Sequence, residues 1–424
     1  MNRPVKTASF SVYDRQSRRW VFFGSALMLA FTLYLLFSPI CLWAAPFAEY
    51  FQFTQPDGAQ LTLWGKGDEF HAVFETTTGY TVVFDPTQQA YFYAQRAADG
   101  KSLISSGVLA HNPVPPGLAQ HTRMDHDAVI AAARARQKQW DAETGLSKRW
   151  SRLKSQTLGT PLAPDEVGAL PAPPETPTIG TKTGLTLLID FSDAPATISQ
   201  TEIEAFLNGD SYTGFGNNGS VKKYFSDVSG SRLTYTNVVT IYVRMIQPKS
   251  YYNDTSMYCG IQGRLLINDA LAILKARSDY NSTILPTFSS LTTDGSGNVV
   301  AFNVFFAGAN SGVWSYGLWP HSWGLASPVP LGNGKSVSAY QITNIGTSLT
   351  LGTFSHENGH MLCDFPDIYD YDYDSMGGAG VFSLMGYGGT GTNPVQVAFV
   401  LVSRSKKVTI LETCIHFLNF EDRY

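Results

Sequence analysis

Residues 356–370 read "HENGHMLCDFPDIYD". On a helix, His356 and His360 lie one turn apart on the same face, so both imidazoles can reach one metal ion. Glu357 points near that ion without being forced to bind it. Its carboxylate can take a proton from zinc-activated water and pass it to a leaving amine. Two histidines on a helix also arise by chance, but the glutamate between them favours a catalytic zinc site.

The third metal ligand has to come from the residues that follow the histidine pair. Pro366 stops the helix and turns the chain back, which favours Asp367 as the ligand. Asp364 and the more distant Asp370 are alternatives, and Cys363 could bind as a thiolate and give a less Lewis-acidic site. A carboxylate as the third ligand leaves the fourth position open for water, as catalysis requires.

A second motif, "FSLMGYG", stands at residues 382–388. Here the sequence resembles the metzincin clan, in which the zinc helix is followed by a tight methionine turn beneath the metal. The resemblance implies that Met385 forms the floor of the site. It also implies that Tyr387 donates a hydrogen bond to the oxyanion, where charge develops. Without the zinc motif, an ordinary core methionine and a buried aromatic would be the simpler interpretations.

Three further segments read "FTQPDGAQLTLWGKGDEFHAVFETTTGYTVVFD" (53–85), "GSVKKYFSDVSGSRLTYTN" (219–237) and "GLWPHSW" (317–323). With the two motifs above, they make the chain resemble the immune-inhibitor-A-like metallopeptidases over most of residues 45–393. The resemblance implies a secreted zinc endopeptidase that acts on protein substrates. It also implies a preproenzyme whose first module is a propeptide covering the active site, removed by cleavage near the linker.

The third-ligand segment departs from the pattern of that family, HExxHxxGxxD. Cys363 stands where the family has glycine, and one extra residue separates this position from the acid. Asp367 therefore lies eleven residues after His356. Asp367 remains the expected ligand, with Asp364 as the alternative.

The N-terminal segment predicts export. Basic residues precede an apolar run over residues 20–43, and two alanines follow it. This order describes a secretory signal peptide over residues 1–45. The run is also long enough to span a membrane as an uncleaved signal anchor, the one membrane association that we expect. Either way, we expect the body of the protein to be secreted or to lie outside the cytoplasm.

The chain has four cysteines, at positions 41, 259, 363 and 414. Cleavage of the signal peptide would remove the first, so at most one internal disulfide can form. We expect that disulfide to join Cys259 to Cys363. The alternative is that both side chains are separate, buried thiols.

The pattern of the chain predicts several parts. Residues 46–118 alternate apolar and polar residues between turn signals, which predicts a small, mostly β module, the propeptide of the resemblance. Residues 119–180 are expected to be helical from Asp125 to about Lys154, with a break at Gly145, and then to form a proline-rich linker open to an activating protease. Over residues 181–394, strand and helix patterns alternate, which predicts a mixed α/β or α+β domain, metzincin-like by the resemblance. The expected strands are 184–193, 232–245 and 298–308, and the expected helices are 198–209, 220–231 and 263–278.

Charge limits the partners of the chain. Charged residues make up 15% and the formal net charge is -4, which gives no electrostatic case for nucleic-acid binding.

The acids in "DIYDYDYDS" (367–375) could hold Ca²⁺ through oxygen ligands, although a solvated turn is the simpler interpretation. Residues 395–424 lose the resemblance and change in composition, so we expect a divergent tail, from a truncated or frameshifted reading frame.

Two functions from different classes fit these features. The first is a secreted zinc metalloendopeptidase that hydrolyses peptide bonds of extracellular proteins, with Glu357 as its general base. The alternative is a catalytically impaired or truncated metal-binding homologue, secreted or anchored in a membrane. A metal site without catalysis would not need Glu357, so this residue favours the enzyme.

Overall fold

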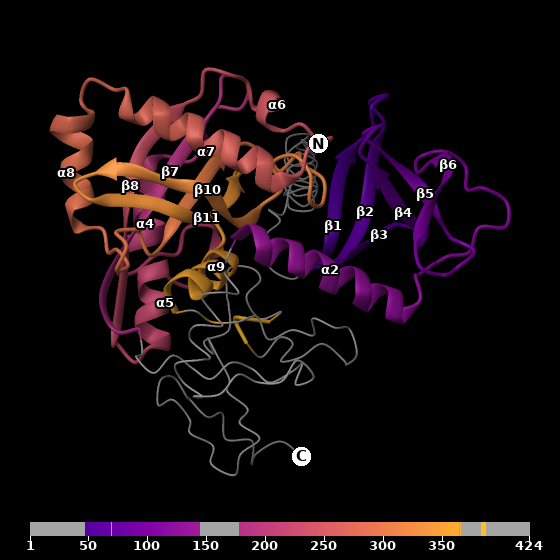
Figure 1. Cartoon of the computed structure of the whole chain (residues 1–424), viewed down its shortest axis with the longest axis horizontal. Helices are drawn as coiled ribbons and strands as arrows, with labels where there is room; N and C mark the ends of the chain where they lie inside the picture. Colours follow the sequence, from indigo (N-terminus) through magenta and orange to yellow (C-terminus); the bar gives the residue numbers. More distant parts are fainter. Residues whose placement is uncertain (1–46, 69, 145–177, 364, 366–382, 387–424) are drawn as a thin grey trace, which may run out of the picture. The chain divides into compact units, whose positions relative to one another are not determined.

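The computed structural model describes residues 47–68, 70–144, 178–363, 365 and 383–386 (Figure 1). These residues form two β-sheets with helices, a mixed α+β content. The expected signal peptide, residues 145–177 with most of the expected proline-rich linker, and the C-terminal tail lie outside the described residues. Within the described residues, no helix is long and apolar enough to cross a membrane.

The first sheet has six strands in sequence order, and every neighbouring pair is antiparallel. This confirms the strand prediction for the N-terminal module. The inward-facing side chains form a hydrophobic core that includes Leu63 and the aromatic rings of Phe51, Phe74 and Tyr91. The strands are β1 (Phe47–Thr54), β2 (Gln60–Gly67), β3 (Ala72–Thr76), β4 (Thr81–Asp85), β5 (Ala90–Arg96) and β6 (Leu103–Leu109).

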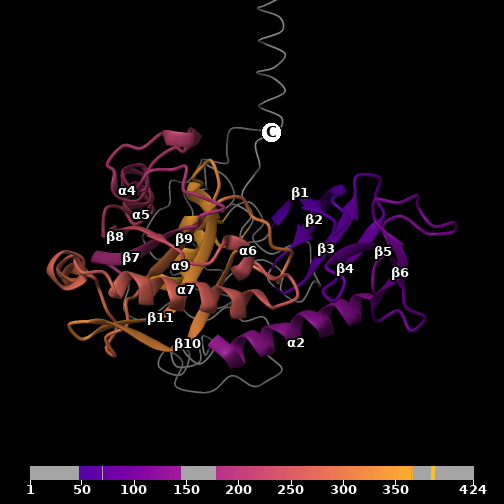
Figure 2. The same ribbon diagram turned by 90° about the horizontal axis from the view of Figure 1, so that it is seen from above.

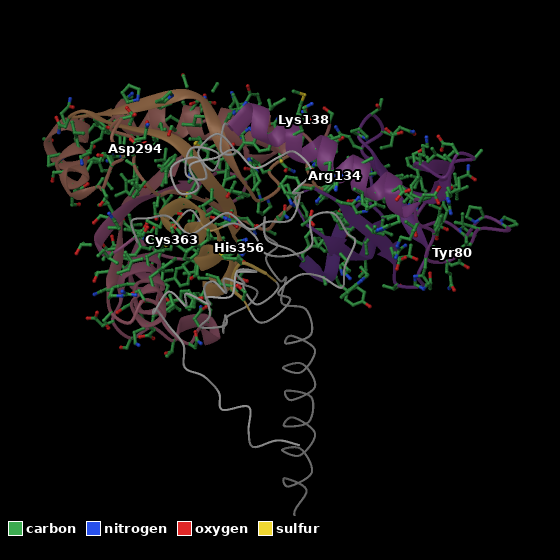
Figure 3. The ribbon with its side chains drawn as sticks, turned by 60° about the horizontal axis from the view of Figure 1, so that its bottom comes forward. Tyr80, Arg134, Lys138, Asp294, His356 and Cys363 are labelled. Atoms are coloured by element: carbon green, nitrogen blue, oxygen red, sulfur yellow. The ribbon has the colours of Figure 1, made fainter. Side chains whose placement is uncertain are left out.

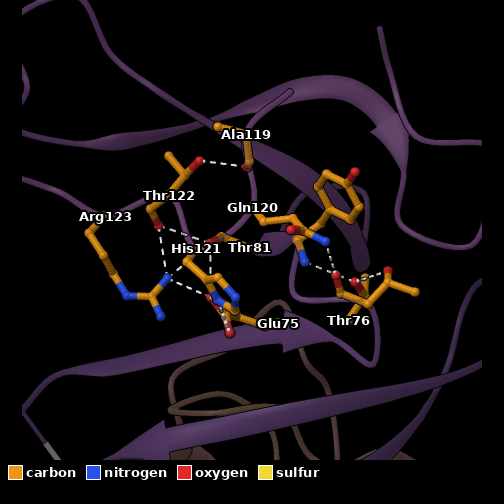
Figure 4. A network of polar contacts seen from close by, with 10 residues as sticks. Glu75, Thr76, Thr81, Ala119, Gln120, His121, Thr122 and Arg123 are labelled. Carbon is orange, nitrogen blue, oxygen red and sulfur yellow. Dashed lines mark hydrogen bonds and ion pairs between the residues drawn. The ribbon is translucent and has the colours of Figure 1, made fainter. Parts of the chain in front are cut away.

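A buried carboxylate ties the segment after β6 back to this sheet (Figure 4). Glu75 on β3 accepts a hydrogen bond from Arg123 Nη1 at 2.7 Å, and its carboxylate lies 3.0 Å from His121 Nδ1. Thr81 donates to the carbonyl of Thr122 at 2.9 Å. These contacts hold residues 119–123 in place just before helix α2 (His126–Thr144). The expected break at Gly145 lies outside the described residues.

The second sheet has five strands in the order β10-β11-β9-β7-β8. Strands β7, β8, β9 and β11 run parallel, and β10 is an antiparallel edge strand. The continuous apolar run of β7 is buried because helices cover both faces of the sheet. The strands are β7 (Gly180–Asp190), β8 (Leu233–Arg244), β9 (Phe302–Ala307), β10 (His321–Gly332) and β11 (Lys335–Ile345).

Helix α7 lies on one face of this sheet, and α4 and α5 lie on the other (Figure 2). Each face carries its own hydrophobic cluster. Leu187 and Phe306 face helix α7, whereas Leu188 and Phe305 face α4, α5 and α9. Ser199 and Ser220 cap α4 and α5 by accepting hydrogen bonds from backbone N–H groups. The longer helices are α4 (Gln200–Asn208), α5 (Val221–Val228), α7 (Cys259–Lys275) and α9 (Leu351–Cys363). Shorter turns are η1 (Gly214–Gly216), α6 (Lys249–Tyr252), η2 (Tyr280–Ile284), α8 (Leu285–Thr287) and η3 (Phe288–Ser290).

Candidate metal centre

Helix α9 carries the histidine pair, and Figure 3 labels His356 and Cys363 on this helix. One stripe of the helix, made of Leu351, Phe354 and Leu362, packs into the apolar cluster on the sheet. By helical period, His356 and His360 lie on the opposite side. Leu351 and Phe354 lie three residues apart, and Leu362 follows eight residues later, about two turns further along the same side. Packing of this stripe on the sheet determines which side of the helix carries the histidines.

The two imidazoles face each other. Nε2 of His356 lies 3.1 Å from Nε2 of His360. Two nitrogens bound to one tetrahedral zinc ion at about 2.0–2.1 Å are about 3.3 Å apart. The spacing therefore fits two ligands of a single ion.

Backbone carbonyls determine the tautomer of both rings. Nδ1 of His356 lies 2.7 Å from the Leu384 carbonyl, and Nδ1 of His360 lies 2.6 Å from the Phe365 carbonyl. A neutral ring that donates from Nδ1 keeps a lone pair on Nε2. Two such lone pairs at 3.1 Å repel each other unless a proton or a metal cation lies between them. A shared proton can fill this position in the absence of metal, and the two nitrogen atoms are placed to bind one metal ion.

Glu357 lies beside this pair and is almost fully buried. Its Oε2 accepts a hydrogen bond from Ser322 Oγ at 2.5 Å. Ser322 is the second residue of β10, the edge strand. The sequence does not point to Ser322, because the contact joins residues 35 positions apart and no local pattern predicts it.

Met385 lies in a tight turn in which Gly386 N donates to the Ser383 carbonyl at 3.1 Å. The side chain is fully buried against α9. A Cβ atom on Gly359 would come within 2.9 Å of Met385 Sδ, so the glycine allows the sulfur to approach the helix. The structure thus places Met385 next to the helix turn that joins the two histidines. Its assignment as the floor of a metal site stays a prediction.

The rest of the predicted ligand set lies outside the described residues. This applies to Asp364, Asp367, the acids at 370–374 and Tyr387. Within the described residues, no group of three or more His, Cys, Asp or Glu side chains gathers in a way that could hold a metal. The third ligand, the oxyanion donor and a calcium site therefore stay predictions.

The expected Cys259–Cys363 disulfide is wrong. Both residues are buried cysteines that form no disulfide. Cys259 begins α7 and packs with Trp319, whereas Cys363 ends α9 in the cluster around Met385. Burial raises the pKa of Cys259 to about 12, so its thiol stays protonated. Cys363 lies one turn beyond His360. In the described residues its thiol does not join the two imidazoles in a group that could hold a metal, and the thiolate alternative stays a prediction.

His321, in the "GLWPHSW" segment, is a buried histidine with two hydrogen bonds. Its Nδ1 donates to the Trp319 carbonyl at 2.6 Å, and its Nε2 accepts from the Tyr340 hydroxyl at 3.1 Å. A Cβ atom on Gly263 would lie 2.9 Å from this ring, so only glycine fits there without a shift. His321 orders the chain just before Ser322.

Acid should destabilise the protein through His321. Burial lowers the pKa of His321 to about 4, while an unfolded histidine titrates near 6.5. Between pH 6.5 and 4 the unfolded chain therefore binds more protons, and this contribution to stability, about 3 kcal/mol, is lost as the pH falls. His321→Gln should lose less stability than the wild type between pH 7 and pH 4 in urea unfolding.

His71 provides an internal reference for that experiment. Burial lowers its pKa to about 4 as well, so both proteins keep this second acid-sensitive group. An equal loss of unfolding free energy in the wild type and in His321→Gln would contradict the assignment to His321.

The loop before β10 contacts the N-terminal sheet. Trp319 stacks on Phe51 with ring centroids 5.7 Å apart and planes at 14°. Trp314 Nε1 donates to the Asp68 carbonyl at 2.9 Å. The loop that contacts the first sheet thus continues directly into Ser322, the partner of Glu357.

No protein-family model matches this chain, and no curated protein matches it. The resemblance to the immune-inhibitor-A-like metallopeptidases stays a prediction. The geometry of the two histidines, the glutamate and the methionine turn is therefore the basis for inferring a function.

Proposed function

We propose that this chain is a zinc-dependent metalloendopeptidase, exported as a preproenzyme, which cleaves extracellular proteins or peptides. One observation carries the proposal. The Nε2 atoms of His356 and His360 face each other at 3.1 Å while both Nδ1 atoms are held by carbonyls. A buried glutamate between the two histidines in sequence adds a base that a purely structural metal site does not need.

The ligands that we propose for zinc are His356, His360 and Asp367, with Asp364 as the alternative acid. Zinc, when bound, would polarise the scissile carbonyl and lower the pKa of water. The histidines enter this role already oriented by Leu384 and Phe365, which reduces the cost of ordering them.

Glu357 is the proposed general base and acid. Ser322 holds Oε2, so we assign Oε1 to accept the proton of the attacking water. The same carboxyl group then gives this proton to the amine nitrogen as the peptide bond breaks. Tyr387 is the proposed donor to the oxyanion that forms on the carbonyl oxygen.

The N-terminal sheet is the proposed propeptide, and the second sheet with α9 is the proposed metzincin-like catalytic domain. Support for a covering role comes from the contacts of Phe51 with Trp319 and of Asp68 with Trp314. These contacts lie on the loop that leads to Ser322. Cleavage in the linker would make this module a separate chain, and its departure would alter the surroundings of that loop.

The experiment that tests the proposal is casein hydrolysis by the processed, zinc-loaded chain, compared with Glu357→Ala. Loss of cleavage with retained zinc supports the enzyme. Bound zinc with no cleavage by either protein would favour the alternative, a catalytically impaired metal-binding homologue.

A further inference from the structure

A closed ring of buried hydrogen bonds joins α9 to the sheet beneath it. The Tyr235 hydroxyl on β8 donates to Asn358 Oδ1 at 2.6 Å. Asn358 Nδ2 donates to Asn303 Oδ1 on β9 at 3.1 Å, and Asn303 Nδ2 donates back to the Tyr235 hydroxyl at 3.2 Å. All three side chains are buried, and none of these bonds is made by the metal ligands. We call this set the Tyr235–Asn303–Asn358 ring.

Neighbouring bonds complete the ring. Gln341 Nε2 on β11 donates to Asn303 Oδ1 at 2.8 Å. The second hydrogen of Asn303 Nδ2 goes to Asn237 Oδ1 at 3.1 Å, and that of Asn358 Nδ2 goes to the Phe354 carbonyl at 2.8 Å. The amide hydrogens of Asn303 and Asn358 are thus all bonded. Beside the ring, Asn237 Nδ2 has no hydrogen-bond partner among the described residues. The ring itself has one preferred arrangement, because any shift of its members leaves a further buried polar group without its partner.

Asn358 lies on the side of α9 opposite to the histidines. Each residue of an α-helix turns by about 100°, so His356 and His360 point about 40° apart. Asn358 then points about 180° from the direction midway between them. It lies in the middle of the buried stripe of Leu351, Phe354 and Leu362, where an apolar residue would be the simpler choice.

A polar residue at that position controls rotation better than an apolar one. Apolar contacts have no direction, so a helix can turn by several degrees on a sheet at little cost. Hydrogen bonds depend on angle and distance, and metal sites work only when their ligands are held within about 0.5 Å and 10–20°. A single buried asparagine can fix the register of packed helices in the same way.

We propose that the Tyr235–Asn303–Asn358 ring sets the rotation of α9, so that the imidazoles of His356 and His360 converge on one metal ion. Asn358 is a positioning residue: it acts on the metal site from the far side of the helix. This inference rests on the proposed metal site, but it does not require that the chain cleaves peptides.

The test uses the full chain, with Tyr235→Phe and Asn358→Leu as ring variants. Each is measured for its zinc dissociation constant by competition with a chromophoric chelator, and for its metal-free melting temperature. We expect about 10- to 100-fold weaker zinc binding, the range found when groups behind metal ligands are changed. The Co²⁺-substituted variants should also show an altered absorption spectrum, which reports the geometry of the ligands.

Phe354→Leu is the matched control. Phe354 is fully buried on the same stripe, one turn before Asn358, and the change removes packing while leaving the ring intact. Lower stability alone does not weaken binding to the folded protein while that form predominates. Phe354→Leu should therefore melt earlier but keep the wild-type zinc dissociation constant.

Two results would overturn the inference. The first is a folded Tyr235→Phe variant that binds zinc as tightly as the wild type. This result would overturn the inference even if Asn358→Leu does not fold, and it would leave the proposed function standing. The second is a control that loses as much zinc affinity as the ring variants. A wild-type chain that binds no zinc would overturn the proposed function itself, and the inference with it.

Discussion

Glu357→Ala should abolish most peptide hydrolysis while zinc stays bound. The carboxylate lies beside the histidine pair but is assigned to proton transfer and not to metal binding, so its loss removes the base and leaves the proposed ligands. General acid–base groups contribute about 10²- to 10⁴-fold to a rate, and we expect kcat to fall by that factor. The measurement is hydrolysis of casein or of a fluorogenic peptide by the processed protein, with zinc content determined on the same sample.

A helix glutamate away from the site provides the control. Glu204 lies on α4 and accepts a hydrogen bond from Gln200, so Glu204→Ala removes a similar side chain without contact with the histidines. This variant should retain wild-type kcat. Equal activity in the wild type and in Glu357→Ala, both with zinc bound, would contradict the role of Glu357.

Asp367→Ala should lose most of its zinc, whereas Asp364→Ala should keep it. Zinc binding at protein sites amounts to about 10–16 kcal/mol over four ligands, so loss of one ligand costs about 3 kcal/mol, roughly a hundredfold in affinity. We expect Pro366 to end the helix and turn the chain back, which would direct Asp367 to the histidines. The measurement is zinc occupancy after dialysis against a weak chelator.

The paired variant makes this prediction decisive. Asp364 and Asp367 are the same residue type, three positions apart, so a general effect of removing charge would appear in both variants. The reverse result, with Asp364→Ala losing zinc and Asp367→Ala keeping it, would assign the third ligand to Asp364.

Much of the second sheet could be predicted because its signals are local. The apolar run of β7, the helical period of α7 and the serine before α4 each lie within one continuous segment. The β10–β11 hairpin carries a weaker signal, since Pro328 and Pro330 interrupt β10. Proline is tolerated there because β10 is an edge strand. Asn333 before a glycine is a hairpin signal, and its φ of 52° agrees with such a turn.

The candidate site could be predicted only in part. His356, Glu357 and His360 belong to one helical turn, so the sequence alone predicts their common face. Ser322 approaches Glu357 from 35 positions away, and Tyr235 approaches Asn358 from 123 positions away. Such contacts depend on the order of strands in the sheet. The same reason explains the wrong disulfide: counting cysteines does not show that Cys259 and Cys363 belong to different clusters.

X-ray absorption at the zinc edge of the purified, processed chain tests the claim on which the proposed function depends. The claim is that α9 holds one zinc ion through His356 and His360 with a carboxylate as the third protein ligand. This predicts one zinc per chain, imidazole scattering from two histidines, and only nitrogen and oxygen neighbours at about 2.0–2.2 Å. A sulfur neighbour at about 2.3 Å would assign Cys363 instead of the carboxylate, and a chain without zinc would contradict the account altogether.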